Sequence, residues 1–252
     1  MHAAPSPSPV PSPARRSGLS VATGIVGELL LTVGALLGLF VIWQVWWTDV
    51  EAAAHQEVVI SDWHQGQDVI VAPERAGEAK TGPAPSIDPF EQGEVMGILH
   101  VPRWGADHRT TIAHGTDMDT VLNRGYAGHY DHTQLPGEVG NFALAAHRQS
   151  RGAPFRAVDQ LQVGDSLIVE TADTYLVYQV SDHEIVLPHQ TEVLYPVPHQ
   201  ADAEPTEAMI TLTTCHPLWS TKERWITYGV LDHWVDKADG KPAELLIEEE
   251  GS

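Results

Sequence analysis

Hydrophobic residues follow two different patterns along this chain of 252 residues. The first is a single continuous run: the nineteen positions from Leu29 to Trp47 carry no charged side chain. At about 1.5 Å per residue, a helix of that length spans roughly 28 Å, close to the thickness of the hydrocarbon core of a bilayer. We therefore expect a transmembrane anchor over residues 19–47, with Glu28 near one face of the membrane.

The second pattern begins at Val95, where short apolar or alternating runs are separated by Gly, Pro, Asp and His. Runs rich in Val, Ile, Thr, Tyr and Leu are typical of strands. Eight short strands with few helices favour an all-β fold, a closed eight-stranded barrel without exposed edges. The candidate strands are Val95–Val101, Thr110–Ala113, Asn141–His147, Ser166–Glu170, Tyr175–Val180, Glu184–Leu187, Met209–Thr214 and Trp225–Leu231.

Two short helices are expected between these strands, at Met118–Arg124 and near Phe155–Gln160. A polar segment of 21 residues separates Leu187 from Met209. A loop that long in a compact domain is usually functional or disordered.

The flanks of the apolar run complete the predicted organisation. Residues 1–18 are rich in Pro and Ser and predict a disordered tail. Residues 48–92 combine Pro, Gly, Ala and charge without a sustained period, which indicates a linker before a folded domain at 93–252. A cleaved signal peptide is the alternative, since residues 52–54 resemble a cleavage site, but signal peptides have shorter apolar regions of about 7–15 residues.

Charges beside the run predict its orientation. Arg15 and Arg16 precede it and Asp49 and Glu51 follow it, so the tail should stay in the cytoplasm and the folded domain should lie outside. An aromatic belt is expected at the outer interface, formed by Trp43, Trp46 and Trp47.

Composition narrows the function classes. The chain has 34 acidic against 14 basic residues, a formal net charge of -20, whereas nucleic-acid binding requires clustered Lys and Arg. No nucleic-acid partner is therefore expected. With a single cysteine, Cys215, an exported domain cannot form an internal disulfide. The thiol is then either a reactive group or a small buried hydrophobe, and composition leaves both open.

Cys215 lies in "TLTTCHP", at the end of a predicted strand. Because side chains of a strand alternate between its faces, the adjacent His216 points away from the thiol, and Pro217 ends the strand. A base must come from elsewhere in the fold. The candidates are His147, at the end of the apolar strand "GNFALAAHR", and His129 and His132 in the loop before it.

Two further features bear on the chemistry. A cysteine nucleophile acts as the thiolate, which a neighbouring cation favours, and Arg224 opens the strand that follows Cys215. Arg224 could instead hold the substrate backbone or an oxyanion, or be a solvated charge. The histidines show no zinc-binding spacing, and His129 and His132 alone are a weak metal signal. No metal or cofactor is expected.

Taken in order, "GHYDHTQLPGEVGNFALAAHR", "LQVGDSLIVETADTYLVYQV", "TLTTCHP" and Arg224 closely resemble the sortase family, over about residues 93–235. The pattern is most similar to class E, the housekeeping type of high-GC Gram-positive bacteria. The resemblance implies a cysteine transpeptidase on an eight-stranded barrel, with Cys215 as nucleophile, His147 as general acid and base, and Arg224 as stabiliser of substrate and transition state.

The resemblance also implies substrates and partners. Family members cleave Leu-Pro-x-Thr-Gly, or Leu-Ala-x-Thr-Gly in class E, between Thr and Gly. They then transfer the surface protein to an amine of a peptidoglycan precursor (lipid II) or of another protein. Groove-lining residues are expected to be Thr213, Thr214, Tyr130 and His129, the last with a structural rather than a catalytic role. The segment between Leu187 and Met209 should wall the groove.

One departure from the family pattern is visible, because Ala146 stands where a glycine usually precedes the histidine. A methyl group there is harmful only if φ is positive. Three alternatives stay open: a pilin-polymerising sortase whose lid contains Asp88-Pro89-Phe90, a noncatalytic membrane-tethered barrel that acts as a binding module, and a cysteine peptidase without transfer activity. The stretch "ELLIEEEGS" contains no second apolar segment, which counts against the pilin alternative.

Overall fold

The computed structural model describes residues 18–66 and 68–246. The chain divides into two compact units, Met1–Trp46 and Trp47–Ser252. Most of the predicted disordered tail, residues 1–17, lies outside the described residues.

A single long helix, α1 (Gly18–His64), contains the predicted anchor. Its side chains between Ile25 and Trp43 include many exposed apolar groups, and the most apolar stretch has a mean hydropathy of 2.4. By length and composition this helix could cross a membrane. It also extends to His64, so that residues 48–64 are helical rather than the irregular linker that was expected.

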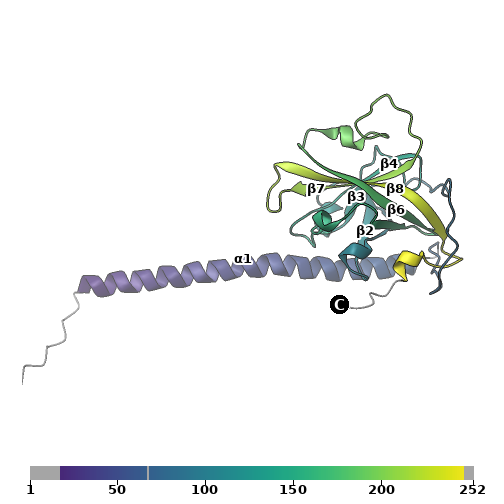
Figure 1. Ribbon diagram of the computed structural model, residues 1–252. Helices are drawn as coiled ribbons and strands as arrows, with labels where there is room; N and C mark the ends of the chain where they lie inside the picture. Colours follow the sequence, from purple (N-terminus) through teal and green to yellow (C-terminus); the bar gives the residue numbers. More distant parts are fainter. Residues whose placement is uncertain (1–17, 67, 247–252) are drawn as a thin grey trace, which may run out of the picture. The chain divides into compact units, whose positions relative to one another are not determined.

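Eight strands form the closed barrel that the sequence predicted, in the order β1-β2-β3-β4-β7-β8-β6-β5 (Figure 1). The strands are β1 (Val95–His100), β2 (Arg109–His114), β3 (Ala127–His129), β4 (Gly140–Ala145), β5 (Ser166–Glu170), β6 (Thr174–Val186), β7 (Ala208–His216) and β8 (Glu223–Asp236).

Short 3-10 helices join the strands. They are η1 (Pro102–Trp104), η2 (Leu122–Arg124), η3 (Val158–Gln160), η4 (Thr191–Leu194) and η5 (Ala243–Leu245). The two predicted helices correspond to η2 and η3, each reduced to a single turn. The two strands predicted between Tyr175 and Leu187 are one long strand, β6, which pairs with β8 along its length and shifts register near Ser181.

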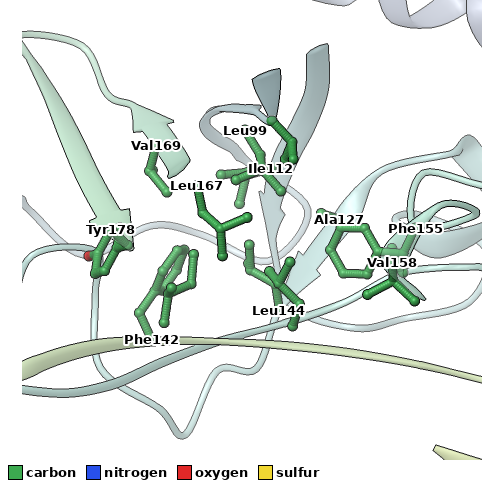
Figure 2. Close-up of a cluster of buried hydrophobic side chains, with 14 of the residues drawn as sticks. Leu99, Ile112, Ala127, Phe142, Leu144, Phe155, Val158, Leu167, Val169 and Tyr178 are labelled. Atoms are coloured by element: carbon green, nitrogen blue, oxygen red, sulfur yellow. The ribbon is translucent and has the colours of Figure 1, made fainter. Parts of the chain in front are cut away.

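The barrel interior is filled by alternate side chains of its strands. Phe142, Leu144, Leu167 and Tyr178 are fully buried in this cluster, together with further aliphatic residues (Figure 2). The Tyr178 hydroxyl accepts a hydrogen bond from the Gly137 N–H at 2.7 Å, which satisfies its one polar atom. Complete burial of large aromatic and aliphatic groups holds the strands, and the site at their ends, in fixed positions.

Parallel pairing of β4 with β7 is the feature that positions the candidate site. Ala145 of β4 lies beside Thr213 of β7, so both strands reach the same end of the barrel together. Two hydrogen bonds continue the alignment beyond the strand pair. The Ala146 N–H donates to the Thr213 carbonyl at 3.2 Å, and the Thr214 hydroxyl donates to the Ala146 carbonyl at 2.7 Å.

The C-terminal part of α1, from Trp47 onwards, belongs to the barrel unit and packs against it. Ile60 is 2% exposed, and Val59 packs against the buried cluster of Ala113, Val121 and Tyr126. At the end of the helix, His64 contacts the buried carboxylate of Glu170 at 3.0 Å. This part of the predicted linker is therefore a docked helix, because apolar side chains along one of its faces pack on the barrel.

The remainder of the predicted linker also runs along the barrel. Lys80 forms an isolated bridge with Trp234, and Ala76 forms one with Lys241. Phe90 packs against the main core. The Asp88-Pro89-Phe90 sequence thus contributes a core contact in this structure.

Candidate active site

Cys215 lies at the end of β7, in the strand that the sequence predicted. In the antiparallel pair of β7 and β8 its direct partner is Arg224. Directly opposed residues project from the same face of a sheet, so the thiol and the guanidinium lie on one side. Cys215 is a half-buried free thiol.

A pocket of about 380 Å³ brings the three predicted catalytic residues together. Cys215 comes from β7, Arg224 from β8, and His147 from the chain that leaves β4. The other lining residues are Met118, Leu122, Tyr130, Ala145, Ala146, Arg148, Gln149, Ser150, Thr213, Thr214 and Thr221. Residues between Leu187 and Met209, the predicted groove wall, are not among them.

His147 is half-buried, and one of its ring nitrogens has a defined partner. Its Nε2 lies 3.1 Å from Oδ1 of Asn123 in η2. Burial lowers the pKa of His147 below its usual value, and the nearby positive charge of Arg151 lowers this pKa further. An imidazole that is neutral near physiological pH can accept a proton, as a general base must.

Asn123 was not found from the sequence. It lies 24 residues before His147, in the short helix predicted at Met118–Arg124, where nothing in the local pattern distinguishes it from the other polar residues. Its amide oxygen accepts a hydrogen bond from Nε2, which would leave Nδ1 of the neutral ring as the basic nitrogen.

The Arg224 side chain is held by the loop between β7 and β8. Its Nη1 donates to the carbonyl oxygens of Thr221 at 3.0 Å and Glu223 at 2.9 Å. These bonds fix one nitrogen of a planar group that has five N–H donors. The guanidinium can therefore donate further bonds toward an oxygen atom beside Cys215.

Three of the predicted groove residues line the pocket. The hydroxyl oxygens of Tyr130 and Thr213 lie 3.1 Å apart, which connects β7 to the loop after β3. The Thr214 hydroxyl is already used in its bond to the Ala146 carbonyl. Thr213 and Tyr130 therefore face the space beside Cys215, whereas Thr214 also ties β7 to the chain that carries His147.

His129, the fourth predicted groove residue, lies elsewhere. It is 1% exposed, with Nε2 at 2.9 Å from the Gln134 carbonyl and Nδ1 at 3.0 Å from Nδ1 of His114. Burial lowers the pKa of His129 to about 4. The structure thus places His129 in a buried hydrogen-bond network, and it is not among the residues that line the pocket.

His216 points away from the thiol, as strand alternation predicted. Its Nδ1 lies 2.9 Å from Nη1 of the buried Arg148, and its ring lies 5.5 Å from that of Trp225. His216 is paired in the strand register with Glu223 rather than with Arg224. The adjacent Cys215 and His216 are therefore not a nucleophile–base pair.

Ala146 fits its position. It is 7% exposed and its φ is not positive, so its methyl group causes no backbone strain. Among the described residues, no group of three or more His, Cys, Asp or Glu side chains has the arrangement to hold a metal ion.

A barrel that places a cysteine, a histidine and an arginine around one pocket is the arrangement expected of a cysteine transpeptidase, and comparison with known proteins assigns the class. Residues 99–232 match the family model described as "Sortase domain". The chain belongs to the sortase family, an enzyme family of cysteine transpeptidases.

Similar proteins place it within that family, in class E. The chain is 36% identical to sortase SrtE1 of Streptomyces coelicolor over 92% of its own length and 64% of that protein, so it spans slightly less than two thirds of this relative. Two solved structures are similar. The SrtA sortase of Actinomyces oris has 42% identity and a TM-score of 0.65, over 69% of this chain and all of that one. Sortase E1 of Streptomyces coelicolor, solved with a tripeptide in its active site, has 37% identity and a TM-score of 0.57, over 62% of this chain and 99% of that one.

Proposed function

We propose that this protein is a membrane-anchored transpeptidase that cleaves a Leu-Ala-x-Thr-Gly or Leu-Pro-x-Thr-Gly sorting signal between Thr and Gly. It then transfers the surface protein to an amine of a cell-wall precursor. The observation that carries the proposal is the single pocket that contains Cys215, His147 and Arg224. A tripeptide occupies the active site of the similar sortase E1, which supports a peptide substrate for this pocket.

Acylation begins at Cys215. His147 accepts the thiol proton, and the thiolate attacks the carbonyl carbon of the signal's Thr. The resulting tetrahedral oxyanion collapses, and the Thr–Gly bond breaks. His147 returns its proton to the departing Gly amine, which leaves a thioester between Cys215 and the Thr carbonyl.

Transfer reverses these roles with a different amine. The acceptor amine attacks the thioester carbonyl while His147 takes a proton from its nitrogen. The Cys215 thiolate leaves and regains a proton. A new amide bond replaces the one that was cut, so no external energy source is consumed.

Arg224 stabilises the charge that develops on the carbonyl oxygen. Its position directly opposite Cys215 in the strand pair supports this role, because a permanent cation there would lie close to the carbon that the thiolate attacks. Hydrogen bonds from a charged donor to a developing oxyanion stabilise the transition state more than the ground state. The Thr213 and Tyr130 hydroxyls, on the pocket wall, are suited to contact the peptide backbone of the signal.

The apolar part of α1 supplies the proposed membrane anchor. Basic residues Arg15 and Arg16 before it and acidic residues after it support a single pass with the N-terminus in the cytoplasm. The catalytic domain would then face the cell wall, where both the sorting signal and the lipid-linked acceptor are found.

Mass spectrometry of products tests the proposal. The chain in detergent is incubated with Leu-Ala-x-Thr-Gly and Leu-Pro-x-Thr-Gly peptides, with and without triglycine as acceptor. We expect cleavage after Thr, and with triglycine a ligated product. Cys215→Ala, His147→Ala and Arg224→Ala should each abolish both. Cleavage by the Cys215→Ala protein would show that the nucleophile is wrongly assigned.

The same experiment separates the alternatives. Hydrolysis without any triglycine product would indicate a peptidase, and ligation only to a lysine-containing pilin peptide would indicate a pilin polymerase. A noncatalytic binding module would leave both peptides intact and Cys215 unreactive toward a thiosulfonate reagent.

A further inference from the structure

The part of α1 next to the proposed anchor contacts the two loops that flank His147. The first loop contains η2 and Asn123, the partner of the imidazole. The second loop follows His147 directly and is closed at its base, because the Phe155 N–H donates to the His147 carbonyl at 3.1 Å. Both loops therefore help to hold the His147 imidazole in position.

Gln56 of α1 holds the first loop. Its Nε2 donates to the Gly125 carbonyl at 2.9 Å, and its Oε1 accepts from the Thr111 N–H of β2 at 2.8 Å. Gly125 is the residue that ends η2, two positions after Asn123. One side chain thus connects the barrel wall to the turn that carries the partner of His147.

His55 of α1 adds a second contact to the same loop. Its Nε2 lies 2.9 Å from the Tyr126 hydroxyl, and the two rings stack with centroids 5.9 Å apart. Two adjacent helix residues therefore hold two adjacent loop residues.

Asp49 of α1 holds the second loop. Its Oδ1 accepts from the Gly152 N–H at 3.1 Å, and its Oδ2 contacts Nη2 of Arg156 at 2.7 Å. This loop has an unusual backbone, with φ of 66°, 53°, 79° and 42° at four successive residues, 150–153. Left-handed conformations at non-glycine residues are strained and persist where surrounding contacts hold them. Asp49 supplies such a contact at the centre of the strained turn.

Ala52, between these two side chains, packs where the loops meet. A Cβ added to Gly152 would lie 3.0 Å from the Ala52 Cβ, and one added to Gly125 would lie 3.5 Å from it. The same added Cβ on Gly125 would lie 2.9 Å from the Arg151 carbonyl oxygen, so the two loops also touch each other. Small residues at all three positions let the helix lie directly on both loops.

We propose that residues 49–56 of α1 are a positioning element for His147, which couples the membrane-proximal helix to the proton-transfer geometry of the active site. The proposal rests on the role of His147 in the proposed function. Asp49 and Gln56 are its positioning residues, and neither lines the pocket that contains Cys215.

Loss of these contacts should also change the titration of His147. The titratable and charged groups near it come from three places. Arg151 lies on its own loop. Arg124, Glu51 and His55 line the neighbouring cavity, and Arg148, Cys215 and Arg224 line the pocket. Burial and Arg151 both hold the pKa of His147 below its usual value. When the loops loosen, water reaches the ring and Arg151 moves away, so this pKa should rise toward 6.5.

The test compares three variants of the full chain in detergent. Asp49→Ala/Gln56→Ala should lower kcat about tenfold with KM unchanged within about twofold, since small displacements of a catalytic group act on the chemical step. Glu57→Ala is the matched control, because the Glu57 carboxylate lies on the same helix but accepts its hydrogen bonds from Arg109 of β2. Asp49→Asn keeps an oxygen for the Gly152 N–H but loses the charge that pairs with Arg156, and should retain wild-type kcat.

An NMR titration of the His147 imidazole, assigned with His147→Gln, gives a second readout that needs no substrate. We expect the double variant to raise this pKa and the control to leave it unchanged. If the double variant does not fold, Ala52→Leu, which presses on both glycines, takes its place. Wild-type kcat and an unchanged His147 titration in a folded variant would overturn the proposal. If the wild-type chain cleaves neither peptide, that result counts against the proposed function instead, because the His147 titration is measured without substrate and does not depend on catalytic activity.

Discussion

Acidification should destabilise the barrel through His129, a histidine held neutral in the folded chain. Its side chain is 1% exposed, and Nε2 lies 2.9 Å from the Gln134 carbonyl, to which it can only donate. Its other nitrogen, Nδ1, lies against Nδ1 of His114 at 3.0 Å and is the acceptor of that bond. Adding a proton to Nδ1 would place a charge in the interior and break the bond to His114.

The size of the effect follows from the two protonation states. Burial lowers the pKa of His129 to about 4 in the folded chain, whereas an unfolded chain titrates near 6.5. Between these values the unfolded state binds more protons, so stability falls as pH falls from about 6.5 to about 4. Between pH 6.5 and pH 4 the free energy of unfolding falls by about 3 kcal/mol. Acidification from pH 7.5 to 5 accounts for about 2 kcal/mol of this loss.

Urea unfolding in a mild detergent, followed by tryptophan fluorescence from pH 7.5 to 5, measures this loss. His129→Gln keeps a donor for the Gln134 carbonyl but cannot titrate, so its stability should fall by about 2 kcal/mol less than that of the wild type over this range. His132→Gln, in the same loop but exposed, should behave as the wild type. Burial also lowers the pKa of His108 to about 4, so His108 adds the same loss of stability on acidification to all three proteins. Parallel pH dependence of the wild type and His129→Gln would refute the reasoning.

Three further changes test other parts of the structure. Glu170→Gln leaves the fully buried Lys237 without the carboxylate that lies 2.8 Å away, and should cost about 3–5 kcal/mol of unfolding free energy in urea; a loss below about 1 kcal/mol would contradict this. Phe142→Ala opens a cavity in the barrel centre and should cost about 3–5 kcal/mol in the same assay, whereas an unchanged midpoint would show that the site is not packed as described. Arg151→Gln removes a positive charge that lowers the pKa of His147, so this pKa should rise. The acidic limb of the pH profile of kcat/KM should then move up toward about pH 6.5, and an unmoved limb would mean that another group controls it.

The sequence predicted the strands with a regular pattern and missed those without one. Short runs rich in Val, Ile, Leu and Thr marked β1, β5 and β7 to within one or two residues. β3 is only three residues long and has a glycine at its centre, so no periodicity could reveal it. The sequence predicts two strands in place of β6, because polar residues at 181–183 interrupt the apolar pattern where the register shifts.

The docked part of α1 was missed for a related reason. Residues 48–64 contain charge and alanine beside the apolar run, and their buried face depends on a barrel that lies far along the sequence. Within the site, strand alternation separated His216 from Cys215, and the position of Arg224 at the start of the next strand suggested its proximity to Cys215. The choice of His147 over His129 and His132 came from the family resemblance. Asn123 could not be identified, because only the folded loop brings its amide to the imidazole.

The parallel pairing of β4 with β7 has a consequence for the newly made enzyme. A parallel partner cannot be reached by a tight turn, so the chain crosses β5 and β6 before it returns to place Cys215 beside His147, 68 residues earlier. Contacts of such sequence separation form slowly, and they form late. Until the barrel closes, Cys215 lies apart from both His147 and the oriented Arg224. In the proposed mechanism, a chain that has not yet folded is therefore without transpeptidase activity, because its cysteine has neither partner until the barrel has closed.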